Sequence, residues 1–225
     1  MTETKTIQET NQLFPIFLKL EQLKLLIVGA GNVGLEKLHA VLQNSPATAI
    51  TVIAPEIKEG VKALTEKHTN ITIVESAYDE VFLNDADLVI VAVNDKTLGE
   101  QIRSDAHQRG LLVNVADTPD LCDFYLGSIV RKGNLKVAIS TNGKSPTIAK
   151  RLKEAFTEML PEELDDVLHN MESIRKKMNG SFAKKVHELN HITKVLAVKE
   201  LPEPKSNSEK RWRRIVTWCL FAFFF

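Results

Sequence analysis

The feature that most restricts the fold is an apolar run that leads directly into a glycine-rich turn. Residues 25–34 read LLIVGAGNVG, which gives Gly29, Gly31 and Gly34 the spacing G-x-G-x-x-G. The run is typical of a buried parallel strand, and residues 35–42 carry apolar side chains at helical spacing. Strand, glycine turn and helix in this order predict a dinucleotide site, although a turn that binds nothing can have the same pattern.

The residues of this turn have different expected roles. Gly29 allows the tight turn, Gly31 lets the backbone approach a pyrophosphate, and Gly34 lets helix and strand pack closely. Asn32 and Val33 begin the helix, whose N-terminus would face the phosphates. We therefore expect these five residues to bind the cofactor.

Strand and helix patterns alternate through the first half of the chain. Strands are expected at residues 49–55, 71–74, 86–93 and 111–115, and helices at residues 57–68 and 98–109. This alternation predicts an α/β, Rossmann-like fold with a parallel sheet and right-handed crossovers. Ligands of such sheets bind at the carboxyl ends of the strands, here residues 29–34, 54–56, 93–95 and 116–118.

The end of the second strand indicates which dinucleotide binds. The acidic residue that usually holds the ribose is missing, because Ala54 and Pro55 stand there and Glu56 follows. We expect the backbone at Pro55 and the side chain of Glu56 to hold the adenosine ribose. Lys58 is the one evident partner for a 2′-phosphate, which favours NAD over NADP. Asn94, after the fourth strand, is a further expected cofactor contact.

A carboxylate follows the fifth strand, in the segment NVAD at residues 114–117. Beside a nicotinamide, Asp117 is a plausible general base. An Asx-type turn leading into Pro119 is the commoner reason for an aspartate there. The residues alone leave both interpretations open.

The pattern changes after the fifth strand. Residues 127–140 predict a β-hairpin with its turn at residues 132–134, and helices are expected at residues 147–160, 161–178 and 181–198. A hairpin and helices have too little core to be independent. We expect them to pack on the nucleotide domain and to bury area in a dimer.

The loop STNGKSP at residues 140–146 offers hydroxyls, amides and an ammonium at a helix N-terminus. Such a loop can bind a carboxylate or phosphate, or it can simply cap the helix. Its spacing is not that of a Walker A loop. The residues one turn into the helix extend a cationic patch or form a solvated face. The candidate substrate ligands are Thr141, Asn142, Lys144, Ser145, Lys150 and Arg151.

Composition excludes several classes of function. The chain of 225 residues has 29 Lys+Arg and 29 Asp+Glu, so no overall charge favours nucleic acid. Cys122 and Cys219 have no metal or redox spacing and, with no signal peptide evident, indicate a reducing cytoplasm. His187 and His191 share a helix face without a third ligand, so no metal site is expected.

The end of the sequence combines a polar linker, the basic cluster KRWRR at residues 210–214 and an apolar run at residues 215–225. The run is shorter than the roughly 20 residues that span a bilayer. It is therefore interpreted as a truncated membrane helix, an interfacial anchor or a frame-shifted end. A membrane contact through residues 211–225 is expected under the first two interpretations.

Several segments together resemble one known family. They are LFPIFL at 13–18, VGAGNVG at 28–34 with Lys37, VIAPE at 52–56, NVAD at 114–117, LCDF at 121–124 and VAISTNGKSP at 137–146. The set is similar to the precorrin-2 dehydrogenase/sirohydrochlorin ferrochelatase family, the N-terminal module of siroheme synthases. The resemblance covers about residues 13–160, and its Ser-Pro segment is absent from ordinary Rossmann enzymes.

The resemblance implies a homodimer with a nucleotide-binding domain, a swapped dimerisation region and a helical tail. Family members oxidise precorrin-2 to sirohydrochlorin with NAD, and some insert ferrous iron. The family's essential aspartate falls on Asp117, and its nucleotide contacts fall on Asn32, Val33, Pro55 and Glu56.

The resemblance also bears on the substrate loop. A serine that is phosphorylated in one branch of the family falls on Thr141, which keeps a hydroxyl but puts the modification in doubt. Because the tetrapyrrole carries many carboxylates, Lys144, Lys150 and Arg151 are its expected ligands.

These observations predict four regions: an NAD-binding domain at residues 13–117, a hairpin and dimerisation region at 118–146, a helical region at 147–200, and a linker with a basic and apolar tail at 201–225. The alternative function is a non-catalytic NAD-binding regulatory module attached to a membrane protein. Such a module would need neither Asp117 nor the Lys144 loop.

Overall fold

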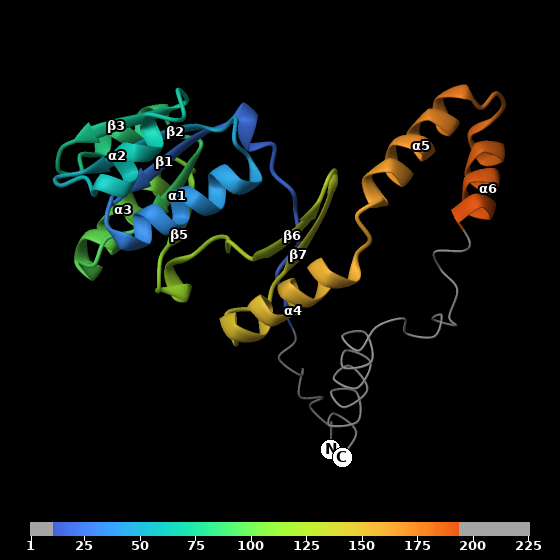
Figure 1. Ribbon diagram of the computed structural model, residues 1–225. Helices are drawn as coiled ribbons and strands as arrows, with labels where there is room; N and C mark the ends of the chain where they lie inside the picture. The colour runs from blue at the N-terminus through green and yellow to red at the C-terminus, as the bar shows by residue number, and fades with distance from the viewer. Residues whose placement is uncertain (1–10, 194–225) are drawn as a thin grey trace, which may run out of the picture. The chain divides into compact units, whose positions relative to one another are not determined.

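The computed structural model describes residues 11–193, which fall into two compact units divided between Leu126 and Gly127 (Figure 1). The expected linker and tail at residues 201–225, with the candidate membrane contact, lie outside the described residues, as does the end of the last expected helix. None of the helices in residues 11–193 has both the length and the hydrophobicity that a transmembrane helix needs.

The first unit is built on a five-stranded parallel sheet with the strand order β3-β2-β1-β4-β5. The strands are β1 (Lys24–Val28), β2 (Ala49–Ala54), β3 (Ile71–Glu75), β4 (Leu88–Val91) and β5 (Leu112–Val115). The chain builds outward from β1 to β3 and then returns to the other side of β1. The topological switch point therefore lies between β1 and β4, where open α/β sheets bind ligands. The predicted Rossmann-like fold is confirmed.

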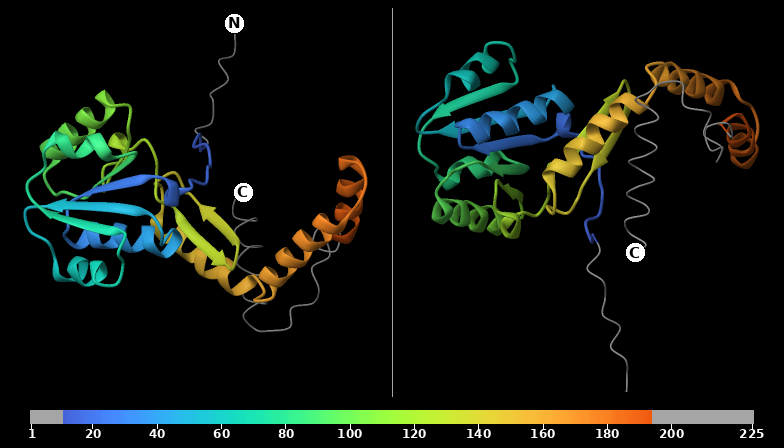
Figure 2. Two further views of the ribbon diagram at one scale, coloured as in Figure 1. Left: turned by 90° about the horizontal axis from the view of Figure 1, so that it is seen from above. Right: turned by 60° about the horizontal axis from the view of Figure 1, so that its bottom comes forward.

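Both faces of this sheet are covered. The helices are α1 (Asn32–Asn44), α2 (Glu59–Thr65) and α3 (Lys96–Gln108), with short 3₁₀ helices η1 (Leu20–Gln22), η2 (Glu80–Asp85) and η3 (Pro119–Leu121). Helices α1 and α2 lie on one face of the sheet and α3 lies on the other (Figure 2). Leu25 and Ile27 of β1 pack with α1 and α2, whereas Leu26 and Val28 pack with η2 and α3. A strand buried on both faces needs a continuous apolar run, which is what β1 has.

The crossover between β3 and β4 differs from the others. Instead of an α-helix it contains η2, whose first turn is capped by the Asp79 carboxylate accepting from the Val81 N–H at 2.9 Å. The sequence gives no helical periodicity there, and no element was expected. Leu83 nevertheless fills the core under β1 and β4 as a crossover helix would.

The first unit continues past β5 to Leu126. The Asp123 N–H donates to the Val113 carbonyl at 2.8 Å, and the Asn114 carboxamide donates to the Phe124 carbonyl at 2.8 Å. These bonds fold the segment after η3 back onto β5, so this segment belongs to the nucleotide unit.

The second unit contains an antiparallel hairpin, β6 (Ser128–Lys132) and β7 (Leu135–Ile139), followed by α4 (Pro146–Met159), α5 (Leu164–Lys177) and α6 (Phe182–Thr193). α4 packs against the hairpin, where Val130, Ala149 and Ala155 are buried. The Asp165 carboxylate accepts from the Asn134 N–H at 2.7 Å and ties α5 to the hairpin turn. The predicted hairpin and helical region are confirmed.

Candidate functional site

Two of the three motif glycines are required by the protein itself. Gly29 has φ +109°, and a Cβ there would lie 2.3 Å from the Ala92 carbonyl oxygen at the end of β4. A Cβ on Gly34 would lie 2.0 Å from the Gly29 carbonyl oxygen. A tight turn against β4 and close packing of α1 therefore explain these two residues without a ligand.

Gly31 is different. An added Cβ would meet nothing within 4 Å, and its φ of −80° is accessible to any residue. The fold therefore does not require glycine at this position. A ligand that approaches the backbone closely does require it, as the pyrophosphate of a dinucleotide would.

The N-terminus of α1 has no side-chain cap. Its N-cap is Gly31, which has no side chain to accept from the first-turn N–H groups. In contrast, the N-cap of α3 is Asp95, whose carboxylate accepts from the N–H groups of Thr97 and Leu98 at 2.9 and 3.2 Å. An uncapped helix N-terminus beside an open glycine is suited to an anion.

The predicted ribose residues lie beside this turn. Pro55 and Glu56 are exposed and follow β2, while Ile57 is buried and anchors the loop. The Lys58 N–H donates to the Ala30 carbonyl at 3.2 Å, which joins this loop to the glycine turn. The structure thus brings the two predicted cofactor segments together.

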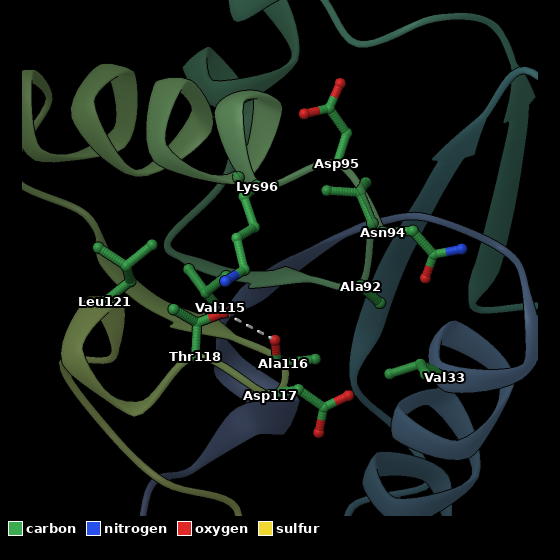
Figure 3. Close-up of a pocket in the computed structure, with 12 residues that line it drawn as sticks. Val33, Ala92, Asn94, Asp95, Lys96, Val115, Ala116, Asp117, Thr118 and Leu121 are labelled. Carbon is green, nitrogen blue, oxygen red and sulfur yellow. Dashed lines mark hydrogen bonds between the residues drawn. The ribbon is translucent and has the colours of Figure 1, made fainter.

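A pocket of about 160 Å³ opens at the carboxyl ends of β4 and β5 (Figure 3). Val33 of α1, Asn94 after β4 and Asp117 after β5 line it, so three residues predicted from separate segments share one site. A dinucleotide bound at this pocket would extend from it along the glycine turn.

Asp117 has an unusual backbone conformation. Its φ is +57°, in the left-handed region that non-glycine residues rarely adopt. Within residues 11–193 its exposed carboxylate takes part in no hydrogen bond or ion pair. The Asx-turn alternative is therefore wrong, because such a turn would use this carboxylate as an acceptor. Strained residues of this kind are frequent at active sites.

The Cys122 thiol forms hydrogen bonds with the loop that carries Asp117. The single proton of the Cys122 thiol is shared between the carbonyls of Val115 and Thr118, whose oxygens lie 3.1 and 3.4 Å from the sulfur. Burial raises the pKa of the Cys122 thiol, which keeps it protonated and able to donate. The Thr118 hydroxyl donates to the Ala116 carbonyl at 3.3 Å (Figure 3). These bonds fix both sides of the Asp117 turn.

Sequence reasoning missed two members of this site. Cys122 was weighed as a metal or redox residue, and its hydrogen bonds depend on a loop geometry that spacing does not reveal. Lys96, the first residue of α3, also lines the pocket. The signal available for Lys96 was its position directly after the predicted strand end at residues 93–95.

The predicted substrate loop lies in the second unit, where its hydroxyls serve local structure. The Thr141 hydroxyl donates to the Ser145 carbonyl and accepts from the Ser145 N–H, both at 3.2 Å. The Ser145 hydroxyl accepts from the Ile148 N–H at 3.2 Å as the N-cap of α4. Helix capping therefore accounts for Ser145. Asn142 is exposed, with φ +53°.

The three predicted cations of this region are exposed. Arg151 pairs with Glu154 at 2.8 Å, within its own helix. Among residues 11–193, Lys144 and Lys150 have no carboxylate partner within 4 Å. The described chain also holds no cluster of three His, Cys, Asp or Glu residues placed for a metal ion.

Comparison with known families identifies the first unit. A family model described as "Putative NAD(P)-binding" matches residues 16–128. The chain belongs to this NAD(P)-binding family. A second model, described as "Sirohaem biosynthesis protein central", matches residues 132–159. The predicted dinucleotide cofactor and the resemblance to siroheme synthases are confirmed.

Curated relatives of this NAD(P)-binding chain include siroheme synthases. That of Psychrobacter cryohalolentis is 40% identical over 149 residues, covering 66% of this chain and 28% of the relative. That of Nitrosococcus oceani is 37% identical over 151 residues, covering 67% of this chain and 32% of the relative. The chain thus spans about a third or less of the length of these relatives.

A solved structure titled "SirC, precorrin-2 dehydrogenase" has a TM-score of 0.66 and 24% sequence identity. The match covers 80% of this chain and 89% of that one, and it shows that the two share a fold.

Proposed function

We propose that this chain is an NAD-dependent precorrin-2 dehydrogenase that forms sirohydrochlorin for siroheme synthesis. The observation that carries the proposal is the Asp117 carboxylate. It is free of internal partners, stands on a strained turn and shares a pocket with the start of α1. The family matches of both units and the sequence similarity to siroheme synthases support the same reaction.

The reaction requires a hydride acceptor and a proton acceptor. NAD, when bound, supplies the hydride-accepting nicotinamide. Asp117 takes the proton from the tetrapyrrole, and its carboxylate is available to do so because no N–H group of the described chain donates to it. The Cys122 and Thr118 hydrogen bonds hold the backbone on both sides, so the carboxylate meets the substrate in a fixed position.

Residues 127–160, which include the hairpin and α4, carry the positive charge that a substrate with many carboxylates needs. Residues 127–160 contain seven Lys or Arg and two Glu, although the whole chain has no net charge. Lys144 and Lys150 lie exposed without carboxylate partners in the described chain, and Arg151 directly follows Lys150 on α4. These cations bind the carboxylates of the tetrapyrrole through charge-assisted hydrogen bonds.

The active species is a homodimer. Neither α5 nor α6 contributes a buried residue to its own unit, and apolar side chains stay exposed on both. They include Val167, Leu168, Phe182, Val186 and Ile192. A second copy covers this surface, which light scattering on the purified chain would measure as twice the monomer mass. The enzyme acts in the cytoplasm, where it binds NAD.

The decisive experiment is an absorbance assay with precorrin-2 and NAD. The Asp117→Asn variant should bind NAD with wild-type affinity, measured by calorimetry, and lose at least about a hundredfold in kcat. Asp120→Asn is the matched control, because Asp120 is an exposed carboxylate on η3 outside the pocket lining.

Wild-type turnover in Asp117→Asn would refute the assignment of the proton acceptor. NAD binding by the wild-type chain without any oxidation of precorrin-2 would instead favour the regulatory module. Repeating the assay with preformed sirohydrochlorin and ferrous iron tests iron insertion separately, since the pyrrole protons released there also need a base.

A further inference from the structure

We propose that Lys58, which lies outside the glycine motif, binds the pyrophosphate of the dinucleotide. The side-chain ammonium of Lys58 contacts the Asn32 carboxamide oxygen, at the first residue of α1. The pyrophosphate of a Rossmann ligand occupies this end of the helix. The inference rests on dinucleotide binding and not on the oxidation of precorrin-2.

The position of Lys58 is built into the fold. Its N–H donates to the Ala30 carbonyl at 3.2 Å, in the middle of the glycine turn. On either side of it, Ile57 and Val61 are buried at 5% and 0% exposure. Gly60 lies against α1, where an added Cβ would be 2.7 Å from a Leu35 methyl carbon. These contacts fix the backbone of Lys58 above the glycine turn.

The charges of this corner favour the binding of an anion. A helix N-terminus carries a partial positive charge, and a cation beside it is unfavourable. Here the ammonium of Lys58 and the uncapped start of α1 place two positive groups together. No carboxylate of the described chain lies within 4 Å of the Lys58 nitrogen, whose partner is the neutral amide of Asn32. A doubly charged pyrophosphate would compensate both groups at once.

This assignment also bears on the choice of dinucleotide. The pyrophosphate is common to NAD and NADP, so Lys58 should strengthen the binding of both equally. With Lys58 committed to the pyrophosphate, residues 54–58 contain no other cation for a 2′-phosphate, and the exposed Glu56 opposes one. The preference for NAD then follows from the composition of this loop.

The test measures the dissociation constants of NAD and NADP by calorimetry in the full chain. Lys58→Ala should weaken both by a similar factor of about ten, Lys58→Glu should weaken both further, and Lys58→Arg should stay near wild type. Lys62→Ala is the matched control, since Lys62 is an exposed lysine one turn along α2. Because the ammonium acts through charge, Lys58→Ala should also reduce the dependence of NAD affinity on salt.

Two results would overturn the assignment. Unchanged NAD affinity in Lys58→Ala would remove Lys58 from the site. A loss confined to NADP would place the ammonium at the ribose 2′-phosphate instead. The dissociation constants are measured without precorrin-2. They therefore test the role of Lys58 even if the chain does not oxidise precorrin-2.

Discussion

Replacing the motif glycines one at a time should separate folding from binding. In Gly34→Ala the new Cβ would lie 2.0 Å from a backbone oxygen that cannot rotate away, so α1 has to move. Overpacking of this kind lowers the free energy of unfolding by about 1–3 kcal/mol. A loss of about 2 kcal/mol lowers Tm by about 4–8 °C in a chain of this size. NAD binding is then lost together with the local structure.

Gly31→Ala should behave in the opposite way. The methyl group meets nothing within 4 Å, and φ −80° suits alanine. Restricting the unfolded chain adds about 0.4–1 kcal/mol of stability, while alanine is a poorer N-cap than glycine by a similar amount. The free energy of unfolding should therefore stay within about 0.5 kcal/mol of wild type. The methyl group would lie where we expect the pyrophosphate to approach the backbone, so NAD affinity should fall at least tenfold, or about 1.4 kcal/mol.

The assay is a urea melt and an NAD titration of both variants and the wild-type chain. A Gly31→Ala variant that binds NAD as tightly as wild type would refute the reasoning, because it would show that the cofactor does not use the open space at Gly31. A Gly31→Ala variant as unstable as Gly34→Ala would refute it as well, since the fold would require both glycines.

Three further predictions concern the elements around the site. Asp95→Ala removes the N-cap of α3 and should lower the free energy of unfolding by about 1 kcal/mol in urea melts; an unchanged value would contradict the capping role. Burial and the hydrogen bond to Asp105 raise the pKa of Tyr78 above its usual value near 10, so the stability that Tyr78 adds is complete below pH 10 and is lost as the pH rises further. Tyr78→Phe should therefore lose less stability between pH 9 and pH 11 than wild type, and an equally steep loss would speak against this linkage. Cys122→Val removes the thiol donor next to the Asp117 turn and should lower kcat with precorrin-2 without changing the KM for NAD. Cys122→Ser keeps a donor and should retain most of the wild-type kcat. A valine variant with wild-type kcat would show that the thiol does not position Asp117.

The sheet was predictable because its strands depend on local composition. β1 and β4 are apolar runs buried on both faces, and such runs stand out in any sequence that alternates them with amphipathic helices. η2 was not predictable in the same way. It is short, its turn depends on one Asp79 cap, and its role depends on Leu83 reaching a core that the sequence does not display.

The site was predicted in part for a similar reason. Motif spacing and strand ends identified Val33, Asn94 and Asp117, since parallel strands bring their carboxyl ends to one edge. The Cys122 hydrogen bonds and the Lys58 contact depend on loops whose path is set by tertiary packing. The sequence also could not distinguish a hydroxyl that binds a ligand from one that caps a helix, and the structure assigns Ser145 to the cap.

The residues that we propose to be functional differ from their neighbours in having no structural role within residues 11–193. Asp117 and Asp123 are both aspartates close to the end of β5. The Asp123 carboxylate accepts from the Val113 N–H and contacts the His107 ring nitrogen, each at 2.8 Å, so its charge serves the fold. The Asp117 carboxylate serves no contact within residues 11–193, although its backbone is strained to present it. Gly31 differs from Gly29 and Gly34 in the same way, because nothing in the described chain needs its missing Cβ. A bound ligand would account for both Gly31 and Asp117 at this sheet edge, which is why the proposed cofactor and proton-acceptor roles rest on them.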